Sequence, residues 1–137
     1  RSVAFGDRDY QRSLRIGRLR VRVIEAANLP GAVFAAVGEA STANPYAVLT
    51  LEHRAWRGET KRRTLCPKWD AEEVVFHVNR HDAVLSVEIY DDGHDHDDRL
   101  GHVEIPVARL AGHGKIRRFF LLKSHFLVDD ASFDFLL

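Results

Sequence analysis

"AVLSVEIYDDGHDHDDRLGHVEIPV", residues 83–107, gives the clearest indication of the fold. In its first part, Leu85, Val87 and Ile89 alternate with polar residues, which is the period of a half-buried β-strand. "GHVEIPV" predicts a second strand. Between the two strands, residues 90–102 contain five aspartates and three histidines, with an Asp-Gly turn dipeptide. The stretch therefore predicts a hairpin with an unusually acidic loop.

The same alternation recurs toward the N-terminus, in "RLRVRVIEA" (residues 18–26), where Leu19, Val21 and Val23 alternate with arginines. Further β-rich runs lie at residues 46–53, 72–78, 116–123 and 132–137, with a weaker run at 57–64. About eight short strands separated by turn residues, without a long helical period, predict an antiparallel β-sandwich or barrel.

The composition restricts the function classes. The 137 residues suit one domain, and the equal numbers of basic and acidic residues give no overall field toward nucleic acid. Cys66, the only cysteine, excludes an internal disulfide and a cysteine zinc cage, and we expect it to pack in the Pro-Trp corner rather than act as a nucleophile. No apolar run approaches the roughly 18 residues of a membrane span. Because the chain lacks Met and opens "RSVAF", we interpret it as part of a longer protein.

Several motifs, in their order along the chain, resemble a C2 domain of the protein kinase C and synaptotagmin type. They are "ANLP" (27–30), "NPYAVLTL" (44–51), "TLCPKWDAEE" (64–73), "LSVEIYDDG" (85–93) and "DDRLG" (97–101). The resemblance covers roughly residues 17–122 and implies an all-β, eight-stranded antiparallel sandwich with loops clustered at one end. It implies a C2 domain at 17–137 after an N-terminal arm at 1–16. Pro67 would form a rigid corner, with Trp69 packed in the core.

The resemblance also implies a calcium site built from aspartates of two loops. Calcium takes about six to eight oxygen ligands, so neither loop is sufficient alone. In the acidic loop, Asp91 and Asp98 match the first and last ligand positions of the family. The middle position is Gly93, and either Asp92 or Asp95 would have to replace it.

The other loop matches this ligand pattern poorly. Asn44 replaces the aspartate that precedes Pro-Tyr, Gly38 stands at the second position, and Glu39 is the only acid. We therefore predict a degenerate site that binds calcium weakly or not at all, with Asp91, Asp92, Asp98 and Asn44 as the remaining ligand candidates and no cofactor. A solvated acidic loop without any metal is the open alternative.

Zinc chemistry is the alternative from another class. His94, His96 and Asp98 match the first three positions of the His-x-His-x-Asp-His motif of metallo-β-lactamase-type hydrolases, but Arg99 replaces the final histidine. That fold needs a longer chain and long helices. The sequence also contains no Gly-x-Ser-x-Gly elbow and no phosphate-binding loop, so we predict a protein that is not an enzyme and has no catalytic residue.

A basic run at residues 54–63 is the first candidate for membrane binding. It contains five Lys or Arg residues and a single acid, Glu59. By similarity to the phosphoinositide-binding surface of C2 domains, the candidate lipid-binding residues are Arg57, Lys61, Arg63, Tyr46 and Tyr90. Strand alternation would place Arg57, Lys61 and Arg63 on one face, and Thr60 and Arg62 on the other. The alternative is a solvated edge strand whose charges protect it against aggregation.

"GAVFAAVG", residues 31–38, is the second candidate. Val33, Phe34 and Val37 at a loop tip would insert into the membrane, each contributing about 1.5–3 kcal/mol if fully buried. A short helix covering the end of the sandwich is the alternative.

These observations together predict a cytoplasmic, membrane-peripheral module that recruits its parent protein to anionic phospholipid. The expected partners are phosphoinositide, phosphatidylserine or phosphatidic acid, with little or no dependence on calcium and no nucleic acid. Two alternatives stay open, a protein-interaction module and a calcium-triggered membrane sensor.

Overall fold

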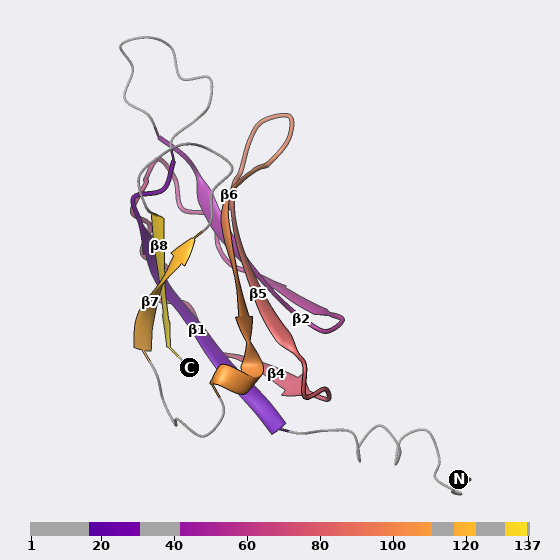
Figure 1. The fold of residues 1–137 in the computed structure, drawn as a ribbon. Helices are drawn as coiled ribbons and strands as arrows, with labels where there is room; N and C mark the ends of the chain where they lie inside the picture. Colours follow the sequence, from indigo (N-terminus) through magenta and orange to yellow (C-terminus); the bar gives the residue numbers. More distant parts are fainter. Residues whose placement is uncertain (1–16, 31–41, 111–116, 123–130, 137) are drawn as a thin grey trace, which may run out of the picture.

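The computed structural model describes residues 17–30, 42–110, 117–122 and 131–136. They form two four-stranded antiparallel sheets packed face to face (Figure 1), with strand orders β4-β1-β8-β7 and β3-β2-β5-β6. The strands are β1 (Gly17–Ala27), β2 (Pro45–Leu51), β3 (Arg54–Arg57), β4 (Val74–Val78), β5 (Val84–Asp91), β6 (Asp98–Pro106), β7 (Arg117–Leu122) and β8 (Ala131–Leu136), with a 3-10 turn at Val107–Arg109. The predicted eight-stranded sandwich is confirmed. The predicted arm at 1–16 and the apolar loop at 31–38 lie outside the described residues.

The alternation of β1 determines which face of its sheet forms the core. Leu19, Val21 and Val23 are buried, whereas the arginines between them are exposed. β1 pairs with β4 through Leu19 and Phe76 and continues into a pairing with β8. The predicted inward set is therefore confirmed, and it supplies one half of the hydrophobic core.

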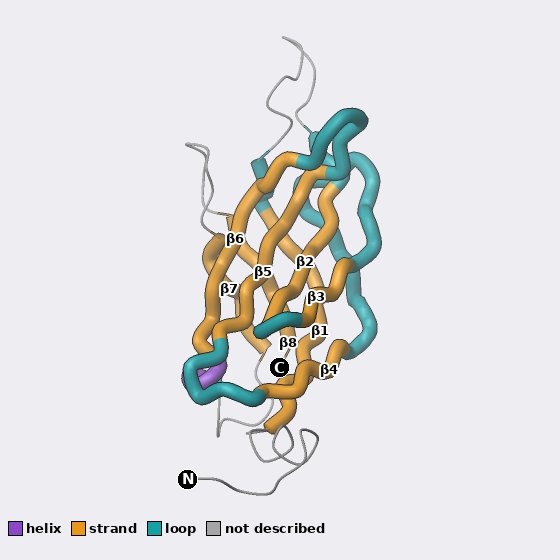
Figure 2. The backbone as a smooth tube through the Cα atoms, turned by 90° about the vertical axis from the view of Figure 1, so that its right-hand side faces the viewer, coloured by secondary structure: helices purple, strands orange, loops and turns teal. Residues whose placement is uncertain are grey.

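β5 supplies the centre of the other half. It lies between β2 and β6, and Leu85, Val87 and Ile89 are fully buried. The polar residues between them face outward and are half-buried. The register brings Pro45 opposite Asp91, and Asp91 opposite Asp98. The start of β2, the end of β5 and the start of β6 therefore lie together at one end of the sandwich (Figure 2).

The weak strand predicted over residues 57–64 is wrong beyond Arg57, where β3 ends. Gly58 still donates its N–H to Ala47 O (2.8 Å), and the next bond to the edge of β2 is from Lys61 N to Pro45 O (2.9 Å). Three steps along this segment match two steps along β2. The extra residue has the effect of a β-bulge and shifts the side-chain alternation after Gly58.

The Pro-Trp corner carries the chain from one sheet to the other. Trp69 is buried, as predicted, and its indole N–H donates to Glu59 O (2.9 Å). Side chains alternate through this corner, so Pro67 and Trp69 face inward and Cys66 and Lys68 face solvent. The prediction that Cys66 packs is therefore wrong, because it occupies an outward position of an extended segment.

Candidate functional site

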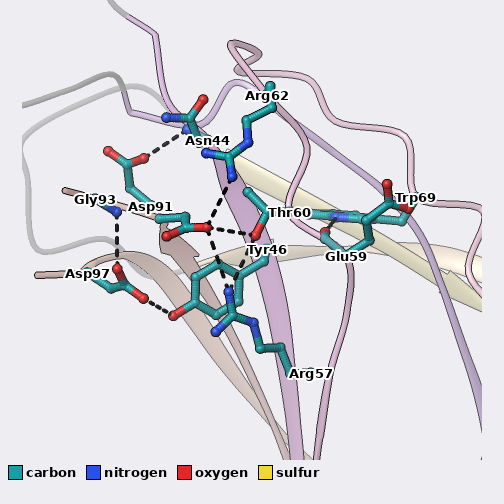
Figure 3. A network of polar contacts seen from close by, with 11 residues as sticks. Asn44, Tyr46, Arg57, Glu59, Thr60, Arg62, Trp69, Asp91, Gly93 and Asp97 are labelled. Atoms are coloured by element: carbon teal, nitrogen blue, oxygen red, sulfur yellow. Dashed lines mark hydrogen bonds and ion pairs between the residues drawn. The ribbon is translucent and has the colours of Figure 1, made fainter.

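The candidate site lies on the outer face of the β3-β2-β5-β6 sheet, where residues 58–63 meet the acidic β5–β6 loop. Tyr46 and Tyr90 are register partners on β2 and β5, and both point away from the core because their neighbours point into it. Arg57 is at the end of β3, opposite Val48 of β2. The sheet therefore brings together three of the five predicted lipid-binding residues, Arg57, Tyr46 and Tyr90. Figure 3 shows two of them, Arg57 and Tyr46.

The two tyrosines form a platform beneath Arg57. Their rings are stacked, with centroids 5.6 Å apart and planes 19° from parallel. The guanidinium carbon of Arg57 lies 3.7 Å from the centroid of the Tyr46 ring, within the range of a cation–π interaction. A guanidinium placed over an aromatic face loses little freedom when it binds an anion, so Arg57 is preorganised.

Asp92 is the acidic partner of this cationic group. Its Oδ2 accepts a hydrogen bond from the Thr60 hydroxyl (3.1 Å) and lies 3.8 Å from Arg57 Nη2 and 3.7 Å from Arg62 Nη2. Arg57 also donates to Thr60 Oγ1 at 3.4 Å. Figure 3 shows Arg57, Thr60 and Arg62 converging on this point. The acidic loop is thus linked to residues 57–62 by an internal ion-pair network.

A second aspartate of the β5–β6 loop, Asp97, links the loop to Tyr46 of β2. It accepts hydrogen bonds from the Tyr46 hydroxyl and from the N–H of Gly93, the latter at 3.0 Å. The bond from Tyr46 keeps the pKa of Asp97 below its ordinary value. Burial, together with that bond to Asp97, raises the pKa of Tyr46 to about 12. Gly93 is required here because a Cβ at this position would overlap the carbonyl oxygen of His96.

The candidate calcium ligands lie near one another but already have protein partners. Asp91 Oδ1 accepts from the N–H of Asn44 (2.8 Å), and Asn44 Oδ1 accepts from the N–H of Arg63 (2.9 Å). Asp92 faces the arginines, and Asp98 lies 3.2 Å from the imidazole of His96. Within residues 17–30, 42–110, 117–122 and 131–136, no three His, Cys, Asp or Glu side chains are grouped so as to hold a metal ion.

These described donors do not fit a calcium site, since Asn44 and Asp92 direct their oxygens toward an N–H and two guanidinium groups. Gly38 and Glu39 belong to the second loop of the predicted calcium site, and they lie outside the described residues. The insertion candidates Val33, Phe34 and Val37 also lie there and stay predictions.

Sequence reasoning divided the basic residues differently from the structure. Lys61 is paired with Glu59 (3.2 Å). Arg63 is in the left-handed region, with a φ of 51°, and its backbone N–H donates to Asn44 Oδ1. Arg62 and Thr60, assigned by alternation to the opposite face, contact the same carboxylate as Arg57. Gly58 was the available signal, because a glycine at the end of a short strand often marks a bulge.

Comparison with known proteins decides the family. The model of the C2 domain family matches residues 17–122. The chain belongs to the C2 domain family. As a C2 domain, it has the sandwich and the end-clustered β5–β6 loop that the motifs predicted.

Solved C2 structures superpose closely on this domain. The pair of C2 domains of extended synaptotagmin 2, in a calcium-bound structure, gives a TM-score of 0.78 at 24% identity over 89% of this chain. Human GIVD cytosolic phospholipase A2, in complex with methyl gamma-linolenyl fluorophosphonate, gives 0.70 at 26% identity over 87%. A single C2 domain of plant extended synaptotagmin 1 gives 0.71 at 18% identity over 89%.

The share of each relative that the chain represents differs widely. It spans 45% of the synaptotagmin pair, 16% of the phospholipase and 92% of the single plant domain. Comparison with curated protein sequences gave no significant match. The similarity therefore describes a C2 domain and not the larger proteins that contain one.

Proposed function

We propose that this C2 domain is a non-enzymatic module that docks on anionic phospholipid membranes without requiring calcium. The observation that carries the proposal is Arg57 held over the stacked Tyr46 and Tyr90 rings on an outer sheet face. An oriented, solvent-accessible guanidinium is suited to lipid phosphate, because its planar donors match phosphate oxygens. In this proposal the domain is peripheral on the membrane and recruits the protein to which it belongs.

The charge on this face supports the proposal. The chain carries no net charge, so attraction to a membrane must come from local separation of charge. Arg54, Arg57, Arg62 and Arg63 are exposed along residues 54–63. Each basic residue near an anionic surface contributes about 1 kcal/mol, so this group is sufficient for reversible binding. Among the residues that the structure describes, no helix is long and apolar enough to cross a membrane.

Independence from calcium is supported by the internal cations of the loop. In the calcium mechanism, the metal ion neutralises carboxylates that would repel an anionic membrane. Here Arg57 and Arg62 lie within 4 Å of Asp92, and Tyr46 holds Asp97. The protein itself thus partly balances the negative charge of the loop. In this proposal Val33, Phe34 and Val37 add apolar insertion, which is one of the two arrangements that the sequence leaves open for residues 31–38.

The test is vesicle co-sedimentation at physiological salt, with calcium and with a chelator. Vesicles of phosphatidylcholine alone are compared with vesicles that also contain phosphoinositide, phosphatidic acid or phosphatidylserine. We expect binding to the anionic vesicles only, equal with calcium and chelator, and weaker as salt rises. An absence of binding to every anionic vesicle would refute the proposal and favour the protein-interaction alternative.

A further inference from the structure

The carboxylate of Asp92 has an environment suited to a larger anion. Two guanidinium groups and one hydroxyl, all from residues 57–62, converge on its Oδ2. The hydroxyl bond is 3.1 Å, but the guanidinium nitrogens lie 3.8 Å and 3.7 Å away. Charge-assisted hydrogen bonds are about 2.7–2.9 Å long, so the two arginines are near the carboxylate without full hydrogen bonds to it. One carboxylate therefore leaves part of their donor capacity unused.

A phosphomonoester is a better match for this group of donors. It has three terminal oxygens and a charge of about −1.5 to −2 near neutral pH, so it can accept from both arginines and from Thr60 together. A carboxylate has two oxygens and a single charge. A phosphodiester, as in phosphatidylserine, also carries a single charge on its phosphate, and gains less over Asp92.

The surroundings keep this position accessible and its cations in place. The Arg57 and Arg62 side chains are 55% and 69% exposed, whereas Asp92 is 27% exposed. Tyr46 supports Arg57 from below, and the N–H of Asp92 is bonded to Asn44 O (2.8 Å). A ligand can thus approach the arginines from solvent, and Asp92 can release them by side-chain rotation without moving its backbone.

We propose that Arg57, Arg62 and Thr60 form a phosphomonoester subsite that the Asp92 carboxylate occupies until a membrane lipid displaces it. The inference rests on the proposed membrane function and adds two things to it. It assigns Arg62 and Thr60 in place of Lys61 and Arg63 beside Arg57, and it makes Asp92 an internal competitor. The competitor gives selectivity, because a dianionic phosphomonoester lipid displaces it better than a phosphodiester lipid does.

The experiment compares Asp92→Asn with Asp95→Asn. The first change removes the competing charge but keeps an oxygen that can accept from Thr60. The second removes the same charge from an exposed position of the same loop. Calorimetry with soluble inositol 1,4,5-trisphosphate measures the subsite without a membrane. Co-sedimentation with phosphatidic acid and phosphatidylserine vesicles, in chelator, measures lipid selectivity.

We expect Asp92→Asn to tighten trisphosphate binding about tenfold, since it removes two ion pairs that the ligand must otherwise replace. Asp95→Asn should change it less than about twofold, as only screened long-range repulsion is lost. Asp92→Asn should also raise binding to phosphatidylserine more than binding to phosphatidic acid, which reduces selectivity. Adding Arg57→Gln and Arg62→Gln to Asp92→Asn should abolish the gain.

The two proposals fail in different ways. Equal trisphosphate affinity of Asp92→Asn and Asp95→Asn would overturn the subsite, whether or not the wild type binds vesicles. So would a gain that survives loss of both arginines. If Asp92→Asn gains trisphosphate affinity through the arginines but no variant binds anionic vesicles, the subsite stands and the membrane function is refuted. Thermal unfolding of each variant shows that the differences occur in folded protein.

Discussion

Two rows of arginine, one on β1 and one over residues 57–62, have different surroundings. On β1, Arg18, Arg20 and Arg22 alternate with core residues and are exposed. The one ion pair found for them among the described residues is Arg20 with Glu73 at 4.0 Å. Arg57, at the end of β3, and Arg62, beyond that end, converge on one carboxylate, and Arg57 also lies on an aromatic platform. Both rows are positively charged, so a count of charges does not distinguish them. The residues that surround each row do.

The physical difference is preorganisation. An exposed arginine on a flat strand loses side-chain freedom whenever it binds, and its exposed ion pairs contribute about 0–1 kcal/mol. Arg57 already has its orientation in the free protein, so less is lost per bond formed. We therefore assign anion binding to the Arg57–Arg62 row and solubility, with protection of the sheet surface, to the β1 row.

Removing Arg57 and Arg62 should weaken membrane binding more than any other change, whereas removing two arginines of β1 should weaken it little. Arg57→Gln with Arg62→Gln should weaken binding to phosphoinositide vesicles about 30-fold, at about 1 kcal/mol for each residue. Arg20→Gln with Arg22→Gln removes the same charge. Those residues face away from the docked surface, at least one sheet spacing of about 10 Å further, beyond the Debye length of about 8 Å in physiological salt. Co-sedimentation should show less than about threefold loss. Equal losses would show that binding depends on the overall charge of the domain and not on the site at Arg57 and Arg62.

The aromatic platform gives the next effect. Tyr46→Leu keeps an apolar side chain at a buried position but removes the ring beneath Arg57. Vesicle binding should fall about fivefold, because a cation–π contact of this kind contributes about 1 kcal/mol. Tyr46→Phe keeps the ring and loses only the hydroxyl bond to Asp97, so it should bind as the wild type does. If Tyr46→Phe lost as much vesicle affinity as Tyr46→Leu, the hydrogen bond from Tyr46 to Asp97, and not the ring beneath Arg57, would be what supports binding.

Acid stability tests whether the loop is anchored as the structure shows. Asp97 has a lowered pKa because Tyr46 donates to it. Its contribution is therefore present above the ordinary aspartate pKa of about 3.9 and is lost as pH falls through the lower folded value. The free energy of unfolding, from denaturant titrations at about pH 6 and pH 3, should fall less for Asp97→Asn than for the wild type. The difference should be below about 1 kcal/mol, because Asp97 is exposed.

Glu73→Gln is the matched change on the β1 side. Its partner Arg20 lies 4.0 Å away, and the side chains are 44% and 59% exposed. This variant should keep the acid dependence of the wild type, as a pair of this kind contributes little. An acid dependence that Glu73→Gln reduces as much as Asp97→Asn would remove the distinction between the two regions.

The sequence predicted the parts of this domain that repeat a simple pattern. Leu19, Val21 and Val23 on β1, and Leu85, Val87 and Ile89 on β5, follow a two-residue period, and burial requires that period to be kept. The ordered motifs then identified the C2 family. The resemblance to C2 domains named Tyr46 and Tyr90, and their proximity follows because both lie within regular strands that pair in register.

The pattern failed where the backbone leaves the sheet. After Gly58 one extra residue shifts the alternation, so Arg62 and Thr60 replace Lys61 and Arg63 beside Arg57. Cys66 was misplaced for a related reason, since an extended corner exposes alternate residues whatever their polarity. Long-range partners such as Tyr46 and Asp97 depend on side-chain conformations that no local period contains.

Calcium should have the smallest effect of all, less than about twofold on vesicle binding. Two oxygens that a calcium ion would need already accept from other groups, Asn44 Oδ1 from the N–H of Arg63 and Asp92 Oδ2 from Thr60. Binding calcium would therefore cost these bonds and bring the ion close to two guanidinium groups, which repel it. Isothermal titration of calcium measures this directly, with Asp91→Asn and Asp98→Asn as controls. A calcium-dependent increase in vesicle binding that either control abolished would show instead that residues 31–41 complete a metal site with Asp91 and Asp98, and that the arginines yield to the ion.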